Sequence, residues 1–131
     1  MKAINASGKR KHAIARVTLR DGKGVVRINS KSLDIYEPEL AKMRIMEPLI
    51  IIGTDAAAKY DIDVNVYGGG WQAQSEASRL GIARALAQAN PSLRKVFLEY
   101  DRQLMIADVR RNEPHKPNDS KPRASRQKSY R

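Results

Sequence analysis

The sequence contains no cysteine and few aromatic residues, and both absences narrow the class of protein. Without cysteine, disulfide scaffolds, thiolate metal sites and cysteine nucleophiles are excluded. Because only 5% of the residues are aromatic, the core must be mostly aliphatic. The N-terminus lacks an apolar run of signal-peptide length, and the run Leu49 to Ile52 is far too short to span a bilayer. We therefore expect a cytosolic protein.

Acidic residues are scarce relative to basic ones. The 131 residues include 14 Asp and Glu against 25 Lys and Arg, a formal net charge of +11. A charge of this sign and size predicts a polyanionic partner. A membrane surface is the alternative, but no basic amphipathic helix with aromatic anchors is visible. At this length we expect one domain with a single core.

Three consecutive glycines, Gly68 to Gly70, organise the middle of the chain. They follow an alternating strand pattern that ends at Val66 and open a helical pattern that runs to about Asn90. Glycine lets a backbone turn sharply and approach another surface closely, and the first N–H groups of a helix attract anions. The segment therefore predicts either a tight strand-to-helix turn without a ligand or a close backbone approach to RNA, and both can hold.

The long helix is unusually rich in alanine and glycine. At about 100° per residue, Ala77 and Leu80 share one face, whereas Ile82 and Leu86 lie roughly opposite. We therefore expect a helix that is covered on two sides and packed close to a sheet. Arg79 and Arg84 are candidates for salt bridges with residues such as Glu76 or for RNA contacts, with RNA favoured for Arg84.

The first part of the chain predicts a hairpin. After a short polar segment, Lys2 to Ser7, the residues from Ala13 to Arg20 alternate between apolar and polar faces. Asp21 to Gly24 has the composition of a hairpin turn, and Val25 to Ile28 is expected to return as the second strand.

The following segments predict short helices. A turn is expected around Leu33 to Tyr36, and Pro38 begins a helical stretch that reaches Pro48. The apolar run after Pro48 is ambiguous, and its flanks favour helix with a break near Gly53. Residues Leu93 to Tyr100 predict a further helix. Together with the strands, these segments indicate an α+β fold.

The composition changes at Asp108, so we divide the chain into a globular part, 1–107, and a long basic C-terminal tail, 108–131. The tail has no hydrophobic face, so burial cannot offset the entropy of ordering it. The alternative is that the tail is a solvated C-terminal segment whose only effect is to improve solubility. However, the basic head formed by Lys9, Arg10 and Lys11 lies directly before a strand, and head and tail together would neutralise many phosphates. Because no helix carries a row of base-reading side chains, we favour an RNA partner over a DNA groove.

Three motifs resemble one known family. The segment GGGWQAQSEASRLGIARAL, from Gly68 to Leu86, is similar to the signature of the universal small-subunit ribosomal protein S-nine family. The opening GKRKHAIARV and the ending QKSYR also look like that family, with the ending of an archaeal or eukaryotic type. The resemblance covers essentially the whole chain.

The resemblance implies a small sheet backed by helices, in a fold like that of the second domain of ribosomal protein S-five. It implies a structural constituent of the cytoplasmic small ribosomal subunit, bound in the head to the 3′ major domain of rRNA beside other head proteins. The tail would reach the anticodon stem-loop of P-site tRNA. Charge and resemblance together assign rRNA contacts to Lys9, Arg10, Lys11, Arg16, Gly68, Gly69, Gly70, Arg84, Arg110, Arg111, Lys116, Lys121, Arg123 and Arg126. The resemblance alone implies tRNA contacts for Lys128, Tyr130 and Arg131.

Two other functions compete with this interpretation. The fold implied by the resemblance is shared with some small-molecule kinases, but the chain lacks a phosphate-binding G-x-x-x-x-G-K-[ST] motif and a convincing carboxylate pair. A free RNA chaperone would bind weakly and without a fixed site. His12 and His115 are isolated, so we expect neither a metal nor a cofactor.

Overall fold

A computed structural model describes residues 1–117, 122, 123, 127 and 129. It has an α+β fold built on one mixed five-stranded sheet with the strand order β1-β2-β5-β3-β4, which confirms the predicted class. The strands are β1 (Ile4–Arg10), β2 (Ala13–Asp21), β3 (Val26–Ile28), β4 (Lys31–Ser32) and β5 (Tyr60–Tyr67).

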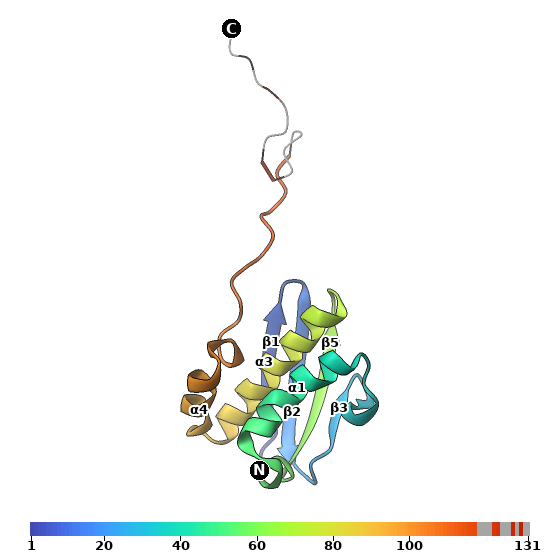
Figure 1. Ribbon diagram of the computed structural model, residues 1–131, viewed down its shortest axis with the longest axis vertical. Helices are drawn as coiled ribbons and strands as arrows, with labels where there is room; N and C mark the ends of the chain where they lie inside the picture. The colour runs from blue at the N-terminus through green and yellow to red at the C-terminus, as the bar shows by residue number, and fades with distance from the viewer. Residues whose placement is uncertain (118–121, 124–126, 128, 130–131) are drawn as a thin grey trace.

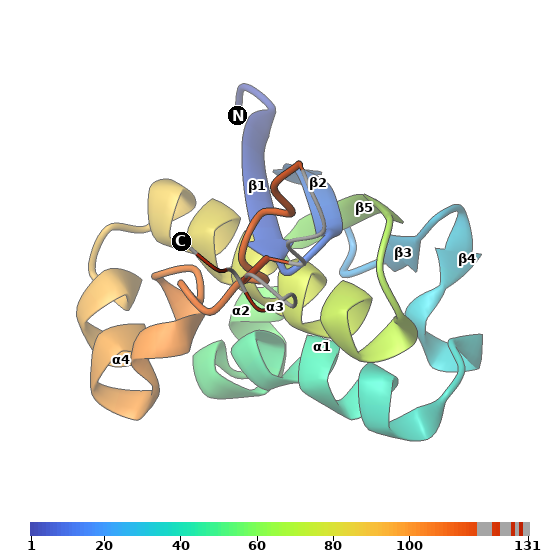
Figure 2. The same cartoon turned by 90° about the horizontal axis from the view of Figure 1, so that it is seen from above.

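The helices back one face of the sheet and leave the other face uncovered (Figures 1 and 2). Their bounds are α1 (Glu39–Ile52), α2 (Thr54–Ala57), α3 (Trp71–Ala89) and α4 (Leu93–Tyr100), with short 3-10 turns η1 (Leu33–Ile35) and η2 (Arg102–Leu104). The predicted helices at α3 and α4 and the turn at η1 are therefore confirmed. Helix α1 continues through the buried Pro48 to Ile52 and breaks at Gly53, where φ is 91°, as the flanks of the apolar run suggested.

The core lies between the sheet and the helices. Alternation in β2 and β5 pairs Val17 with Val64 and Leu19 with Ile62 across the two strands, and all four side chains are buried. Helix α3 packs on β1 and β2 with one side and on α1 with another, which confirms the prediction of a helix covered on two sides.

Small residues let α3 approach β1 closely. A Cβ on Gly8 would lie 2.0 Å from the carbonyl oxygen of Ala77, and a Cβ on Gly81 would lie 2.6 Å from a methyl group of Val17. The glycines at these two positions therefore set the distance between the sheet and its main helix.

The predicted hairpin between β2 and β3 is wrong. Strand β5 lies between them, pairing antiparallel with β2 and parallel with β3. The Asp61 carboxylate of β5 accepts hydrogen bonds from the backbone N–H groups of Lys23 and Val25, at 2.8 and 3.0 Å. These bonds join the turn to β5, and they lower the pKa of Asp61 below its ordinary value. The turn residues are local, whereas the competing strand comes from about forty positions later in the chain.

Strand β1 was not predicted, because its segment is polar and carries little apolar alternation. It is an edge strand that pairs antiparallel with β2, and it buries Gly8 instead of a large side chain. Lys11, with φ at 52°, forms the turn between the two strands. The true hairpin of the chain is thus β1–β2.

The start of the tail leaves the globular body without forming a helix or strand over the described residues 108–117 (Figure 1). The expected division of the chain at residue 107 stays a prediction.

We predict that Gly8→Ala lowers the free energy of unfolding by about 1–3 kcal/mol, because the added methyl group meets the backbone of α3. Urea unfolding of the purified chain measures this loss. Gly70→Ala is the matched control, since a Cβ at Gly70 meets nothing within 4 Å. Equal stability of the two variants would contradict the proposed close packing.

Candidate nucleic-acid interface

The three glycines serve the turn into α3 and its contact with the β1–β2 hairpin. Gly68 and Gly69 have φ values of 79° and 64°, which side chains rarely adopt. A Cβ at Gly68 would lie 2.5 Å from the carbonyl oxygen of His12, so the close backbone approach is to the protein's own hairpin. Only Gly70 faces open space, and an RNA contact by the three glycines stays a prediction.

A basic groove forms where the head meets the tail. It has a volume of about 350 Å³ and is lined by Lys9, Lys11, His12, Arg110, Arg111 and Asn112. No carboxylate lines it, and Lys9, Lys11 and Arg111 form no salt bridge within the part of the chain that the structure describes. The sequence assigned the four Lys and Arg residues to two separate segments, and the structure brings them to one place.

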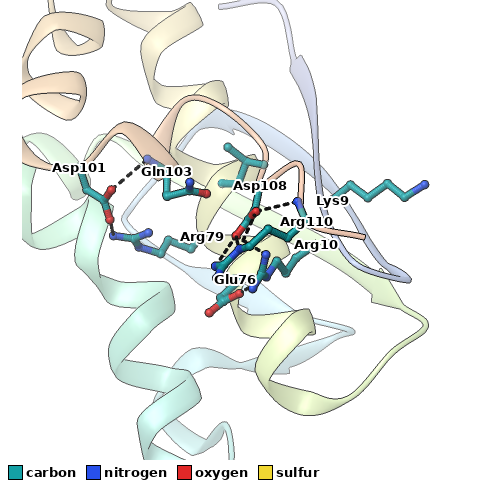
Figure 3. Close-up of a pocket in the computed structure, with 9 residues that line it drawn as sticks. Lys9, Arg10, Glu76, Arg79, Asp101, Gln103, Asp108 and Arg110 are labelled. Carbon is teal, nitrogen blue, oxygen red and sulfur yellow. Dashed lines mark hydrogen bonds and ion pairs between the residues drawn. The ribbon is translucent and has the colours of Figure 1, made fainter. Parts of the chain in front are cut away.

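An ion-pair cluster centred on Asp108 holds the two sides of this groove together (Figure 3). The Asp108 carboxylate pairs with Arg10 of β1 and accepts from Arg110 Nη2 at 2.6 Å. Arg10 also donates from Nε to Glu76 of α3 at 2.7 Å. The Asp108 side chain is only 9% exposed, so this carboxylate is a fixed internal partner of the first tail residues.

The same cluster changes the interpretation of Arg10. Its side chain is 15% exposed and pairs with two carboxylates, so most of its charge is neutralised inside the protein. The rRNA contact of Arg10 stays a prediction, whereas its visible task is to anchor the tail.

Arg84 and Arg79 connect elements of the fold through hydrogen bonds and salt bridges. Arg84 donates from Nη1 to the carbonyl oxygen of Ser7 at 3.0 Å and from Nε to that of Met105 at 3.2 Å. Arg79 bridges Glu47 of α1 and Asp101. Sequence reasoning expected a salt bridge to Glu76 as one option, and Glu76 instead pairs with Arg10 and Arg44.

The uncovered face of the sheet carries a second set of cations. Arg16 and Arg20 of β2 and Arg27 of β3 are exposed, and none forms a salt bridge with any described residue. A shallow groove of about 620 Å³ passes Arg20 and Arg27. Only Arg16 was assigned from the sequence. The alternation of β2 already placed Arg20 beside it, but Arg27 needed the β5–β3 pairing.

The remaining predicted residues belong to the tail. Lys116 is exposed, and Arg123 donates from Nη2 to Glu113 at 3.0 Å. Lys121, Arg126, Lys128, Tyr130 and Arg131 lie outside the described residues.

The described residues include neither a candidate metal site nor a candidate membrane-spanning helix. They contain no group of three or more His, Asp or Glu side chains that is placed to hold a metal ion. No helix among them is long and apolar enough to cross a membrane.

Comparison with known proteins decides the family. Residues 8–131 match the family described as "Ribosomal protein S9/S16". This chain belongs to that family. The small ribosomal subunit protein uS9 of Methanococcus maripaludis strain C7 is 46% identical over 135 residues, which cover all of both chains. The protein of the same name from Methanococcus vannielii is also 46% identical over the full length of both.

Membership of the S9/S16 family confirms three predictions. The S-nine resemblance was correct, the protein is a ribosomal protein with a part in translation, and it is a structural protein and not an enzyme. The kinase alternative is therefore excluded.

We predict that Asp108 stays ionised far into the acid range. Its pKa is lowered chiefly by the hydrogen bonds from the Arg110 side chain and backbone, and further by the charge of Arg10. Because the folded-state pKa is depressed, the stability it contributes is present above the unfolded value of about 3.9 and is lost as pH falls through the folded value. Carbon-13 NMR titration of the carboxyl groups measures the pKa directly.

The Asp108→Asn variant provides the second arm of this test. Its loss of stability relative to the unsubstituted protein is expected to be constant at neutral pH and to shrink progressively as pH falls below about 4. Glu99→Gln removes an exposed carboxylate without a salt bridge in the described structure and serves as the control. Titration of Asp108 at the ordinary value would show that the cluster does not hold the tail.

Proposed function

We propose that this S9/S16 family member is a structural constituent of the small ribosomal subunit that binds rRNA in the subunit head. The relatives at 46% identity are small-subunit proteins by name, and they match over the full chain. In this proposal the fold is of the ribosomal protein S-five domain-two type, and the rRNA partner is the 3′ major domain.

The basic groove is the observation that carries the proposal. It joins Lys9 and Lys11 of the β1–β2 hairpin to Arg110 and Arg111 of the tail, and no carboxylate lines it. Arg110 is held by Asp108 behind the groove, so the phosphates that would enter it meet the other three cations, which form no salt bridge with a described residue. Such contacts position a protein on RNA through its backbone and carry no base sequence directly. Arg10 and Asp108 act behind the groove by fixing the relative position of its two walls.

The uncovered sheet face supplies a second rRNA surface. Arg16, Arg20 and Arg27 stand on it beside Asn65 and the carboxylate of Asp63, so cations outnumber carboxylates there. The shallow shape suits a rounded RNA backbone better than a small molecule. Groove and sheet face together fit a protein that packs into folded RNA. A free chaperone that binds without a fixed site has no need of such built surfaces.

The tail forms the second part of the proposal. Its direction away from the body over residues 108–117 would let the following basic residues pass through rRNA (Figure 1). We propose that Lys128, Tyr130 and Arg131 lie near the anticodon stem-loop of P-site tRNA, where Arg131 adds a positive charge beside the phosphates. Lys116, Lys121, Arg123 and Arg126 would contact rRNA on the way, and the tail would order on binding.

We predict that Lys9→Ala/Lys11→Ala/Arg111→Ala weakens binding to a head-domain rRNA fragment and reduces its salt dependence. The slope of log affinity against log salt is expected to fall by about one unit for each phosphate that the variant no longer neutralises. Filter binding at several salt concentrations measures both quantities.

The matched control is Lys59→Ala/Arg94→Ala/Lys95→Ala, which removes the same charge at exposed positions that do not line the groove. If control and groove variants bind the fragment equally weakly, binding depends on net charge alone and the groove has no special part.

We predict that deleting Ser129 to Arg131 lowers retention of P-site tRNA and raises frameshifting, while the protein still enters the subunit. Arg131→Lys keeps the charge and is expected to behave nearly as the unsubstituted protein. Crosslinking from residue 131 in purified subunits carrying P-site tRNA identifies the neighbouring RNA. Attachment to rRNA alone would reduce the tail to an anchor.

A further inference from the structure

The outer side of α1 exposes large apolar side chains. Leu40, Met43 and Ile50 are 64%, 57% and 66% exposed, and Ile35 in the preceding turn is 69% exposed. Spacings of three and seven residues place the three helical side chains on one side of α1. They form an apolar stripe on a helix that lies away from β1 and β2 (Figure 2). Glu47, which pairs with Arg79, lies between Met43 and Ile50 on this side of the helix.

The inner side of α1 is already covered. Ala41, Ile45 and Pro48 are buried, and α1 packs along α3. A helix that is apolar on its outer side as well is normally covered on both. With 14 residues, α1 is too short to cross a bilayer, so a membrane span does not explain the stripe.

The segment that carries the stripe differs in charge from the rest of the chain. Residues 34–55 hold five carboxylates and only two cations in a chain with a net charge of +11. Both cations are engaged: Lys42 donates to the carbonyl oxygen of Asp34 at 3.0 Å, and Arg44 pairs with Glu76 at 2.8 Å. Exposed carboxylates at Asp34, Glu37, Glu39 and Asp55 therefore dominate this region.

A surface of this kind does not suit RNA. Carboxylates repel phosphates, and the apolar stripe offers no donor to them. The matching partner carries apolar side chains with lysine or arginine beside them, which is a common composition in proteins that bind RNA.

We infer that the outer side of α1 docks an apolar and basic segment of a neighbouring small-subunit protein. The inference rests on the proposed place of this chain in the subunit. It divides the molecule into two surfaces: the basic groove and sheet face meet rRNA, and the acidic apolar side of α1 meets a protein.

The first test replaces Leu40, Met43 and Ile50, one at a time, with a photo-crosslinking amino acid in chains assembled into purified small subunits. The same amino acid at Arg27 on the sheet face serves as a matched probe. We expect the α1 probes to attach to one ribosomal protein, at a segment that mass spectrometry shows to be apolar and basic. The Arg27 probe is expected to attach to rRNA.

The outcomes separate the inference from the proposed function. Attachment of the α1 probes to rRNA, to a second copy of this chain, or to nothing would overturn the inference. Attachment of the Arg27 probe to rRNA would in each of these cases leave the proposed function standing. Absence of the chain from the subunits would overturn both.

The second test removes the stripe without the probe. Leu40→Ser/Met43→Ser/Ile50→Ser changes exposed positions, so affinity for the rRNA fragment is expected to stay unchanged. The melting temperature is expected to fall only slightly, because serine favours a helix less than leucine or methionine does. In subunits assembled in competition with the unsubstituted chain, occupancy by the variant is expected to fall on the order of tenfold. The reason is that the variant lacks the three apolar side chains that the partner would bury. Val25→Ser, at a 41% exposed site outside the acidic region, is the control. Unchanged occupancy of the triple variant would contradict the inference.

Discussion

The close packing of α3 against β1 and β2 is the constraint on which the rest of the structure depends. The backbones approach so far at Gly8 and Gly81 that any side chain at Gly8 would strike the helix. This approach places Glu76 of α3 within reach of Arg10 at the end of β1, and Arg10 in turn holds Asp108. Geometry in the core thereby determines where the tail begins.

Arginine has two different tasks in this protein. Arg10, Arg79 and Arg84 fasten elements together through carboxylates and backbone carbonyls, and their charges are largely satisfied internally. Among the described residues, Lys9, Lys11 and Arg111 at the groove and the three arginines on the uncovered sheet face form no salt bridge. A net charge of +11 therefore overstates the charge available to RNA but indicates its sign correctly.

The surface of the protein has two regions of different chemistry. Cations gather on the sheet face and at the groove, whereas the α1 side combines carboxylates with exposed apolar side chains. In a large ribonucleoprotein particle a small protein contacts both RNA and other proteins. RNA phosphates are bound by cations and hydrogen-bond donors, whereas protein partners bury apolar side chains. A single domain satisfies both because its sheet has helices on one face only (Figure 2).

The sequence by itself determined the local elements and the class of partner. The alternation of β2 and β5, the length of α3, the break at Gly53 and the basic tail composition all follow from spacing and residue type. The family was also recognisable from three short motifs. These features depend on neighbours within one turn or one strand, which periodicity records.

Only the tertiary structure decided which distant segments meet. The insertion of β5 between β2 and β3, the polar edge strand β1 and the joining of head and tail cations all depend on contacts between residues far apart in the chain. The same contacts give Arg10 and Arg84 partners inside the protein. Residue type gives the charge of a side chain, but its partner is set by the fold, because pairing energies favour whichever opposite charge or carbonyl the packed core brings within reach.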